Sequence, residues 1–196
     1  DENGKPYKSS GGKMTWNNQL NKKIPMFWQS AELSSYGKIV SGGTPSTAQN
    51  CYYAEEGIAW ITPNDLSNNA NNMFVSHGER DISLQGLNNS SAKLMPPNSI
   101  LLSTRAPIGY IAISMNEIST NQGFKTLVPN DTENVSFLYY LIKRNVAYLE
   151  QMGTGTTFKE VSKDSLEHLP VILPPDNILS QFAEKVKPYI MQRKLY

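Results

Sequence analysis

The sequence is poor in charge, in cysteine and in long apolar runs. Charged residues make up 18% of its 196 residues, against roughly 25% in an average soluble domain. The formal net charge is +1, so the chain as a whole carries no excess charge that would by itself attract a polyanion. The single cysteine, Cys51, excludes a disulfide framework within the chain and a four-cysteine metal site, and it fits a reducing cytoplasm.

Segments that would direct the chain into or across a membrane are also missing from the sequence. No apolar stretch approaches the ~18 residues of a membrane span, and the first residues lack the apolar core of a secretion signal. We therefore expect a soluble, cytoplasmic domain with no membrane partner. The sequence opens on Asp1 and closes on Tyr196 inside a helical pattern, so we expect both ends to be cut from a longer protein.

Signatures of catalysis are missing as well. The stretch GTGTT at 153–157 resembles a phosphate-binding loop, but it lacks the GK[ST] ending and follows a predicted helix instead of a strand. His77 and His168 have no neighbours at metal-ligand spacing, and Cys51 has no base partner in the sequence. The sequence predicts no catalytic centre, no metal and no cofactor. It leaves polar loops whose backbone NH groups and hydroxyls can contact a polymer backbone.

What the sequence does contain is a series of short apolar segments bounded by Gly, Pro and Asn. Residues 99–104 and 110–114 predict a strand pair, with Arg105 carried at the corner between them. Apolar residues at steps of three and four predict a helix over 133–152 that Gly153 ends. These elements favour an α+β fold with a mixed, strongly curved sheet and flanking helices.

The chain divides into three parts on composition. Residues 1–23 are polar and Gly-rich, which predicts a linker or extended arm. Residues 24–174 form the domain itself, in which Ser30 is expected to cap a short helix through Tyr36. Residues 175–196 begin a further helix after Pro174 and Pro175, and Pro188 should kink or weaken it.

A set of short motifs appears in a fixed order along this chain. They are GGTPS (42–46), IAWITPNDL (58–66), SSAKLMPPNSILLSTRAPIGYIAI (90–113), TNQGF (120–124), GTGTTFKEVS (153–162) and LPVILPP (169–175). Each is weak alone, but the ordered set resembles the target recognition domain of the specificity subunits of type I restriction-modification systems. The resemblance runs from about Trp28 to the end of the chain.

This resemblance implies a function and a set of partners. It implies a non-catalytic reader of double-stranded DNA that recognises one half of a split target site. It would direct adenine methylation by methyltransferase subunits and DNA cleavage by a restriction subunit. It also implies that residues 175–196 begin the helical spacer on which the methyltransferase subunits dock.

Candidate DNA contacts follow from the chemistry of DNA. Arg and Lys neutralise phosphates or pair with guanine, Asn and Gln pair with adenine, and hydroxyls donate to phosphates. The candidates for contact with the DNA backbone are Thr44, Ser46, Lys93, Arg105, Lys125, Thr154, Thr156, Thr157 and Lys159. The candidates for reading bases, all on predicted loops or loop edges, are Asn64, Asn68, Asn69, Ser76, His77 and Arg80.

Each of these assignments has a structural alternative. GGTPS is equally a turn that its glycines and proline require, and Arg105 is equally a residue that locks its corner by bonding nearby groups. At the level of the whole domain, the alternatives are the recognition domain of a stand-alone DNA methyltransferase and a protein-binding or carbohydrate-binding module.

Overall fold

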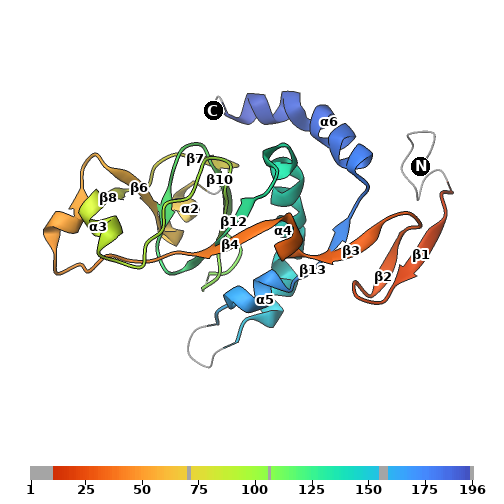
Figure 1. Ribbon diagram of the computed structural model, residues 1–196, viewed down its shortest axis with the longest axis horizontal. Coiled ribbons are helices and arrows are strands. Elements are labelled where there is room, and N and C mark those ends of the chain that lie inside the picture. Colours follow the sequence, from red (N-terminus) through yellow and green to blue (C-terminus); the bar gives the residue numbers. More distant parts are fainter. Residues whose placement is uncertain (1–10, 70–71, 106, 155–158, 195–196) are drawn as a thin grey trace.

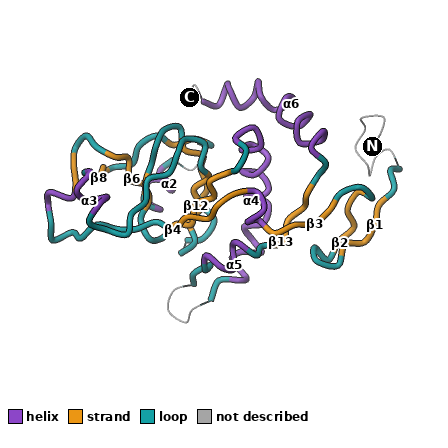
Figure 2. Tube along the Cα trace, viewed as in Figure 1, coloured by secondary structure: helices purple, strands orange, loops and turns teal. Residues whose placement is uncertain are grey.

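The structure is a computed structural model that describes residues 11–69, 72–105, 107–154 and 159–194. Its elements are spread along one long axis (Figure 1), with a strand hairpin at one end, a central sheet with helices beside it, and a smaller sheet at the other end. Strands and helices occur together along this axis (Figure 2). The α+β class predicted from the sequence is confirmed.

A five-stranded mixed sheet with the order β4-β12-β9-β10-β7 forms the centre. Its strands are β4 (Gly37–Ser41), β7 (Phe74–Val75), β9 (Ile100–Ser103), β10 (Ile111–Ser114) and β12 (Phe124–Pro129). Strand β9 pairs antiparallel with both β12 and β10, while β7 joins β10 in parallel. The predicted strand pair is thus confirmed, and it lies in the interior of the sheet.

Strand β9 is buried along its whole length because both faces of the central sheet are covered. Ile100 and Leu102 face one apolar cluster, whereas Leu101 faces a second cluster together with Phe124. This two-sided burial explains why the strand reads as an uninterrupted apolar run. The first cluster is closed by α4 (Val135–Met152), which packs on β9 and β10 and confirms the predicted helix.

A four-stranded sheet with the order β11-β6-β8-β5 forms the far end of the molecule (Figure 1). Its strands are β5 (Tyr53–Ala54), β6 (Ile58–Ile61), β8 (Arg80–Ile82) and β11 (Ser119–Thr120), and the helices beside it are η2 (Asn50–Tyr52), α2 (Pro63–Asn68) and α3 (Leu84–Asn88). The strands are therefore divided among several sheets, where the sequence suggested one curved sheet.

The remaining elements surround the central sheet. They are β1 (Met14–Asn17), β2 (Lys22–Pro25), β3 (Gln29–Glu32), η1 (Leu33–Tyr36), η3 (Thr132–Asn134), α5 (Lys163–Glu167), β13 (Pro170–Leu173) and α6 (Asp176–Lys194). Helix α6 packs on α4, where Phe182 meets the ring of Phe137 edge-on at 6.0 Å. It continues through Pro188. Within the described part of the chain, no helix combines the length and apolar character of a membrane span.

Three local predictions differ from the structure. The helix expected from Ser30 is instead strand β3 followed by a single 3₁₀ turn, because β3 pairs with the distant strand β13. The segment 1–23, predicted as a linker or extended arm, carries strand β1 and the first two residues of β2, which pair as a hairpin that ends at Pro25. The loop expected around Asn64 is helix α2, since Thr62 and Asp65 form a capping box and Pro63 occupies the first turn.

Tyr36 ties the start of the domain to its C-terminal part. Its hydroxyl donates a 2.9 Å hydrogen bond to the carbonyl of Ile172 in β13. Burial, and secondarily the charge of Asp176, raises the pKa of the Tyr36 hydroxyl to about 12. A tyrosine whose pKa is raised on folding contributes stability that is present below its unfolded pKa and is lost as the pH rises towards its folded value.

We expect Tyr36→Phe to lower the free energy of unfolding by about 1 kcal/mol at pH 7, because the Ile172 carbonyl loses its donor. The wild type should in addition lose stability between about pH 10 and pH 12, and the variant should lack that part of the loss. Urea unfolding at a series of pH values measures both effects. Tyr189→Phe, at a residue that is 69% exposed, is the control. An equal change at pH 7 in both variants would contradict the role assigned to the Tyr36 hydrogen bond.

Candidate DNA interface

Several of the sequence motifs meet at one place in the fold. The backbone NH of Gly43 donates to the carbonyl of Thr120 at 2.9 Å, which joins GGTPS to TNQGF. The NH of Thr104 donates to Gly123 at 2.8 Å, and the NH of Val161 donates to Thr104 at 2.9 Å. We call the residues 42–46, 104–105, 120–125, 153–154 and 159–161 the motif junction. Their backbones form one hydrogen-bonded unit.

The glycines of GGTPS are required by this crossing. A Cβ atom on Gly42 would collide with the backbone carbonyl of Asn121, and one on Gly43 would collide with the backbone of Ser91 and Ala92. The carbonyl of Gly43 also accepts a 3.0 Å hydrogen bond from the indole NH of Trp60. These contacts favour the structural alternative for the two glycines and leave the hydroxyl residues after them as the possible DNA contacts.

The polar residues in and near GGTPS differ in their exposure and in whether they already have a hydrogen-bond partner. The hydroxyl of Thr44 donates to the side-chain carbonyl of Gln122, so this hydroxyl already has a partner. Ser46 is exposed. Lys93 is exposed too, and it directly follows the Ser91–Ala92 backbone against which Gly43 packs. Ser46 and Lys93 are therefore accessible to a phosphate.

Arg105 and Lys125 share one carboxylate. Glu160 accepts from Arg105 Nε at 2.9 Å through one oxygen and from Lys125 Nζ at 3.0 Å through the other. The side chain of Lys125 is 9% exposed and that of Arg105 is 46% exposed. Lys125 is thus buried in an ion pair, and a role for it as a surface phosphate contact does not fit this position. Arg105 remains accessible.

The charges around Glu160 determine its protonation. Partial burial raises the pKa of the Glu160 carboxyl, but the hydrogen bonds and charges of Arg105 and Lys125 outweigh burial and bring the pKa below its ordinary value. Glu160 is therefore an anion at neutral pH. The two cations exceed it by one charge, so this part of the motif junction keeps a net positive charge.

Arg80 lies beside the motif junction. The guanidinium carbon of Arg80 sits 3.7 Å from the centre of the Tyr53 ring, and the Tyr53 hydroxyl donates to the carbonyl of Pro45 at 2.8 Å. Arg80 is also paired across the sheet with Trp60, whose indole bonds Gly43. The Tyr53 ring thus connects the exposed Arg80, a base-reading candidate, to the Pro45 backbone of GGTPS.

Four of the other base-reading candidates line a separate cavity of about 530 Å³ between α2, the loop after β7 and the end of α6. Asn68, Asn69, Ser76 and His77 contribute to its wall. The amide of Asn69 is used internally, because its Nδ2 donates to Phe74 at 2.9 Å and its Oδ1 accepts from Asn72. Asn64 is exposed on α2 and is not part of this wall.

The cavity carries a mixed charge. Arg193 and Lys194 from α6 face Asp65 and Glu79 across it. Asp65 is also a structural hub, since it accepts hydrogen bonds from the backbone NH groups of Thr62 and Glu79 at 2.7 and 2.8 Å. His77 approaches the buried carboxylate of Asp81 at 3.4 Å. Carboxylates in the wall repel phosphate, so the cavity is a poorer DNA surface than the motif junction.

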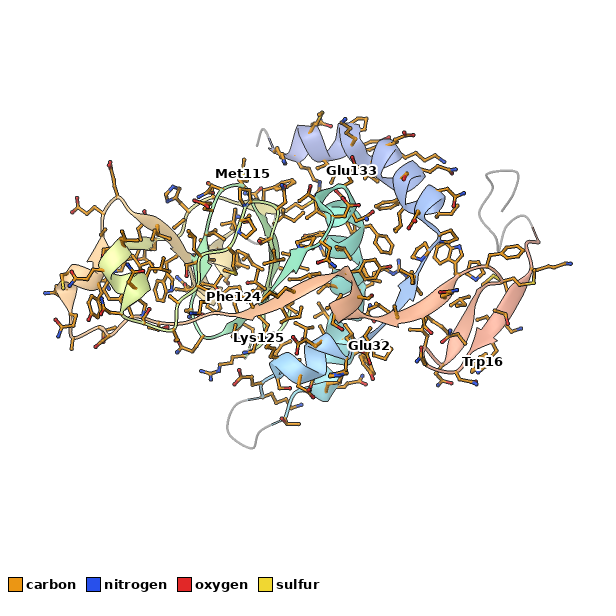
Figure 3. The ribbon with its side chains drawn as sticks, in the orientation of Figure 1. Trp16, Glu32, Met115, Phe124, Lys125 and Glu133 are labelled. Carbon is orange, nitrogen blue, oxygen red and sulfur yellow. The ribbon has the colours of Figure 1, made fainter. Side chains whose placement is uncertain are left out.

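Met115 in the wall of the cavity lies apart from Lys125 of the motif junction. In Figure 3, Met115, which lines the cavity, is at the upper edge, Lys125 of the motif junction is at the lower edge, and Phe124 lies between them. Residues that are separated in one view are also separated in the molecule. The structure therefore does not unite all sequence-predicted DNA contacts into one surface.

The loop GTGTTFKEVS is only partly described. Thr154 is exposed, and its backbone pairs with that of Glu160. Lys159 is exposed and lies beside Gly153. Thr156 and Thr157 lie outside the described residues. Among the described residues, no three His, Cys, Asp or Glu side chains gather as a metal site would require.

Sequence reasoning missed three residues at this interface. They are Glu160, Gln122 and Tyr53, which hold Arg105, Thr44 and Arg80 in place. Glu160 and Gln122 lie within motifs already noted, but Glu160 is 55 residues from Arg105 in the sequence. No local pattern connects residues at that separation.

Comparison with known proteins places this fold and its motifs in a class. The family model described as "Type I restriction modification DNA specificity domain" matches residues 25–195. The chain therefore belongs to the type I restriction-modification specificity domain family.

Individual relatives agree with this assignment. The chain is 38% identical over 154 residues to the type I restriction enzyme MjaIX specificity subunit of Methanocaldococcus jannaschii, a match that covers 78% of this chain and 35% of the relative. It is 27% identical over 166 residues to the HindI specificity subunit of Haemophilus influenzae, covering 83% and 35%. The chain thus spans about a third of the length of these relatives.

A solved structure shares the fold. The crystal structure of the HsdS subunit from Thermoanaerobacter tengcongensis superposes with a TM-score of 0.60 at 20% identity, over 87% of this chain and 40% of that one. At this identity the likeness concerns the fold alone.

Proposed function

We propose that this chain is a DNA target recognition domain that reads one half of a split site in a type I restriction-modification complex. The observation that carries the proposal is the family match over residues 25–195, to a domain described by its DNA specificity. The relatives are specificity subunits, which favours this function over the recognition domain of a stand-alone methyltransferase. The domain acts by binding, and catalysis belongs to its partners.

The motif junction is the proposed contact with the DNA backbone. Arg105 is an accessible cation there, and Lys93, Lys159, Ser46 and Thr154 are exposed around it. Phosphate contacts of this kind set the register and orientation of a protein on the duplex without reading sequence. A junction built from the motifs on which the family resemblance rests suits that task.

Arg80 is the proposed base-reading residue. Arginine pairs bidentately with guanine in the major groove, and the Tyr53 ring holds this arginine beside the motif junction. Asn68, Ser76 and His77 form a second candidate surface at the cavity. Replacement of each surface in turn separates them, because only the true reading surface changes the methylated sequence. We expect Arg80→Ala to change the motif and Asn68→Ala to leave it unchanged.

The proposed partners are DNA, the methyltransferase subunits and, through the complex, the restriction subunit, and the proposed location is the cytoplasm. We also propose the division into an arm at 1–23, a recognition domain at 24–174 and the start of a helical spacer at 175–196. The packing of Phe182 of α6 on Phe137 of α4 supports a spacer that is anchored on the domain.

Duplex DNA binding as a function of salt tests the proposed function. The full chain, alone and together with the methyltransferase subunits, should bind duplex DNA with an affinity that falls steeply as salt rises. Methylome sequencing of cells that carry the intact subunit supplies the target sequence. If no salt-dependent duplex binding is found in either form, the chain is not a DNA reader, and a protein-binding or carbohydrate-binding role becomes the better proposal.

Replacement of Arg105 tests the proposed backbone contact. We expect Arg105→Ala to weaken binding of target and nontarget duplexes alike, by about tenfold, and to reduce the magnitude of the salt slope by about 0.9. Arg144→Ala removes the same charge from the exposed face of α4 and is the control. Circular dichroism monitors folding. A loss of helix signal in Arg105→Ala would assign Arg105 to the scaffold instead.

A further inference from the structure

Glu160 binds Arg105 through an anionic group that resembles a DNA phosphate in its hydrogen-bonding geometry. The carboxylate binds Arg105 Nε at 2.9 Å, and a guanidinium recognises carboxylate and phosphate by the same planar geometry. Arginine has further NH donors, and no described residue accepts a hydrogen bond from the terminal nitrogens of Arg105. Arg105 thus binds an internal anion through Nε, while its terminal nitrogens are available to another anion.

The backbone fixes Glu160 in this place. Thr154 and Glu160 exchange NH-to-carbonyl hydrogen bonds of 3.1 and 2.9 Å, and Glu160 forms a further bridge with Arg105. The next residue, Val161, is buried and bonds Thr104. The backbone of Glu160 is therefore fixed by its own hydrogen bonds and by those of the next residue. The backbone position places the carboxylate beside Arg105.

Lys125 provides the second hold on the carboxylate. Its ammonium is 3.0 Å from Glu160, and its side chain is 9% exposed. A buried ammonium needs a partner, because an unpaired charge in that position is costly. Lys125 therefore keeps Glu160 in place when Arg105 engages another anion.

We propose that Glu160 is a positioning residue of the motif junction, which acts through Arg105 and lowers the affinity of the domain for the phosphate backbone of any DNA duplex. This proposal rests on the proposed function. Nontarget binding consists almost entirely of contacts between cations and phosphates. A fixed carboxylate reduces the positive potential that Arg105 offers to any phosphate. A target duplex adds base contacts to this weakened backbone binding, whereas a nontarget duplex has the backbone contacts alone.

Glu160→Gln tests the proposal in the full chain. We expect this variant to bind a random-sequence duplex about three- to tenfold more tightly at low salt, with a salt slope steeper by about 0.9. Binding of the target duplex should gain by a similar factor, because the contact of Arg105 with phosphate does not depend on the base sequence. A role in folding alone predicts the opposite, which is weaker binding of both duplexes.

Glu167→Gln is the matched control. Glu167 lies in an ion pair with Lys163 at 3.4 Å, and its side chain is 31% exposed, against 32% for Glu160. The two variants therefore change the net charge equally and each breaks an ion pair of a carboxylate with similar exposure. An equal rise in nontarget affinity in both would overturn the proposal, because the effect would then follow from net charge.

If Glu160→Gln alone does not fold, the double variant Glu160→Gln with Lys125→Met tests the same proposal. It removes the buried ion pair as a unit, a change that proteins often tolerate, and it leaves the net charge of the chain unchanged. Arg105 then has no carboxylate, and nontarget affinity should still exceed that of the wild type. Nontarget affinity at the wild-type value in this folded double variant would overturn the proposal.

The wild type separates the two proposals. If the wild type shows salt-dependent duplex binding while the folded Glu160 variants show no gain in nontarget affinity, the role of Glu160 is wrong and the DNA-reading function stands. If the wild type shows no duplex binding under any salt condition, both are wrong.

Discussion

Phe124→Ala should lower the free energy of unfolding by about 3–5 kcal/mol, which is the cost of emptying a large, fully enclosed aromatic site. Phe124 is completely buried and belongs to the apolar cluster between the central sheet and the small sheet, together with Ile61 and Leu101. The total stability of a domain is only about 5–15 kcal/mol. The variant should therefore be close to unfolding at physiological temperature.

Urea unfolding followed by circular dichroism measures this effect. Phe27→Ala makes the same chemical change at a side chain that is 69% exposed, and it should alter stability by no more than about 0.5 kcal/mol. Phe124→Leu fills most of the site and should cost far less than Phe124→Ala. A loss below 1 kcal/mol in Phe124→Ala would mean that the two sheets do not share a closed core at this point.

Gly42→Ala is the second substitution for which we expect a large effect, a loss of about 3 kcal/mol. The added Cβ would meet the backbone carbonyl of Asn121 and the hydroxyl of Thr120. Backbone atoms cannot move aside as the end of a flexible side chain can, so β4 and the TNQGF turn must separate. The hydrogen bond from the Gly42 NH to the carbonyl of Phe124 at 3.2 Å should be lost as well.

Gly153→Ala is the control for this prediction. Its Cβ would lie 3.1 Å from the terminal methyl of Ile108 and 3.3 Å from Lys159 Cβ, contacts that a small shift relieves, so we expect a change of about 1 kcal/mol or less. Thermal unfolding of the pair measures the difference. Equal effects at Gly42 and Gly153 would show that the close approach at the motif junction is not what requires glycine in GGTPS.

The elements that the sequence predicted well are those whose signal is local and long. Helix α4 follows from apolar residues at helical spacing with Gly153 at its end, and the β9–β10 pair follows from apolar runs on both sides of a Pro-Gly turn. Such elements bury one face or both faces wherever they pack. Their identity therefore does not depend on the partner.

The elements that the sequence failed to predict depend on distant partners or on very short segments. Strand β3 exists because β13 pairs with it from the far end of the chain, and this pairing overrides the capping signal of Ser30. The hairpin strands β1 and β2 are too short and too polar to show a strand period. Helix α2 did carry a usable signal, the capping box between Thr62 and Asp65, which the surrounding asparagines obscured.

The candidate site was predictable as a list of residues but not as a surface. The chemistry of DNA singles out Arg105, Lys125 and Arg80 from the sequence alone. The chemistry does not show that Lys125 is buried against Glu160. Nor does it show that Arg80 lies beside GGTPS while Asn68 and His77 line a separate cavity. Whether a side chain is buried, and which surface it joins, is determined by the tertiary fold.

The strand order of the central sheet has a consequence for synthesis on the ribosome. Among the described strands, β4 pairs with β12 alone, so Ser41 cannot pair until its partner Lys125 has been synthesised. At the usual rate of translation, the intervening chain takes on the order of ten seconds to emerge. During that interval both edges of β4 are unpaired, and the face of the sheet that α4 covers lacks its helix. Nascent chains are thus exposed to aggregation until β12 emerges, and conditions that slow translation between these two strands should lower the yield of folded protein.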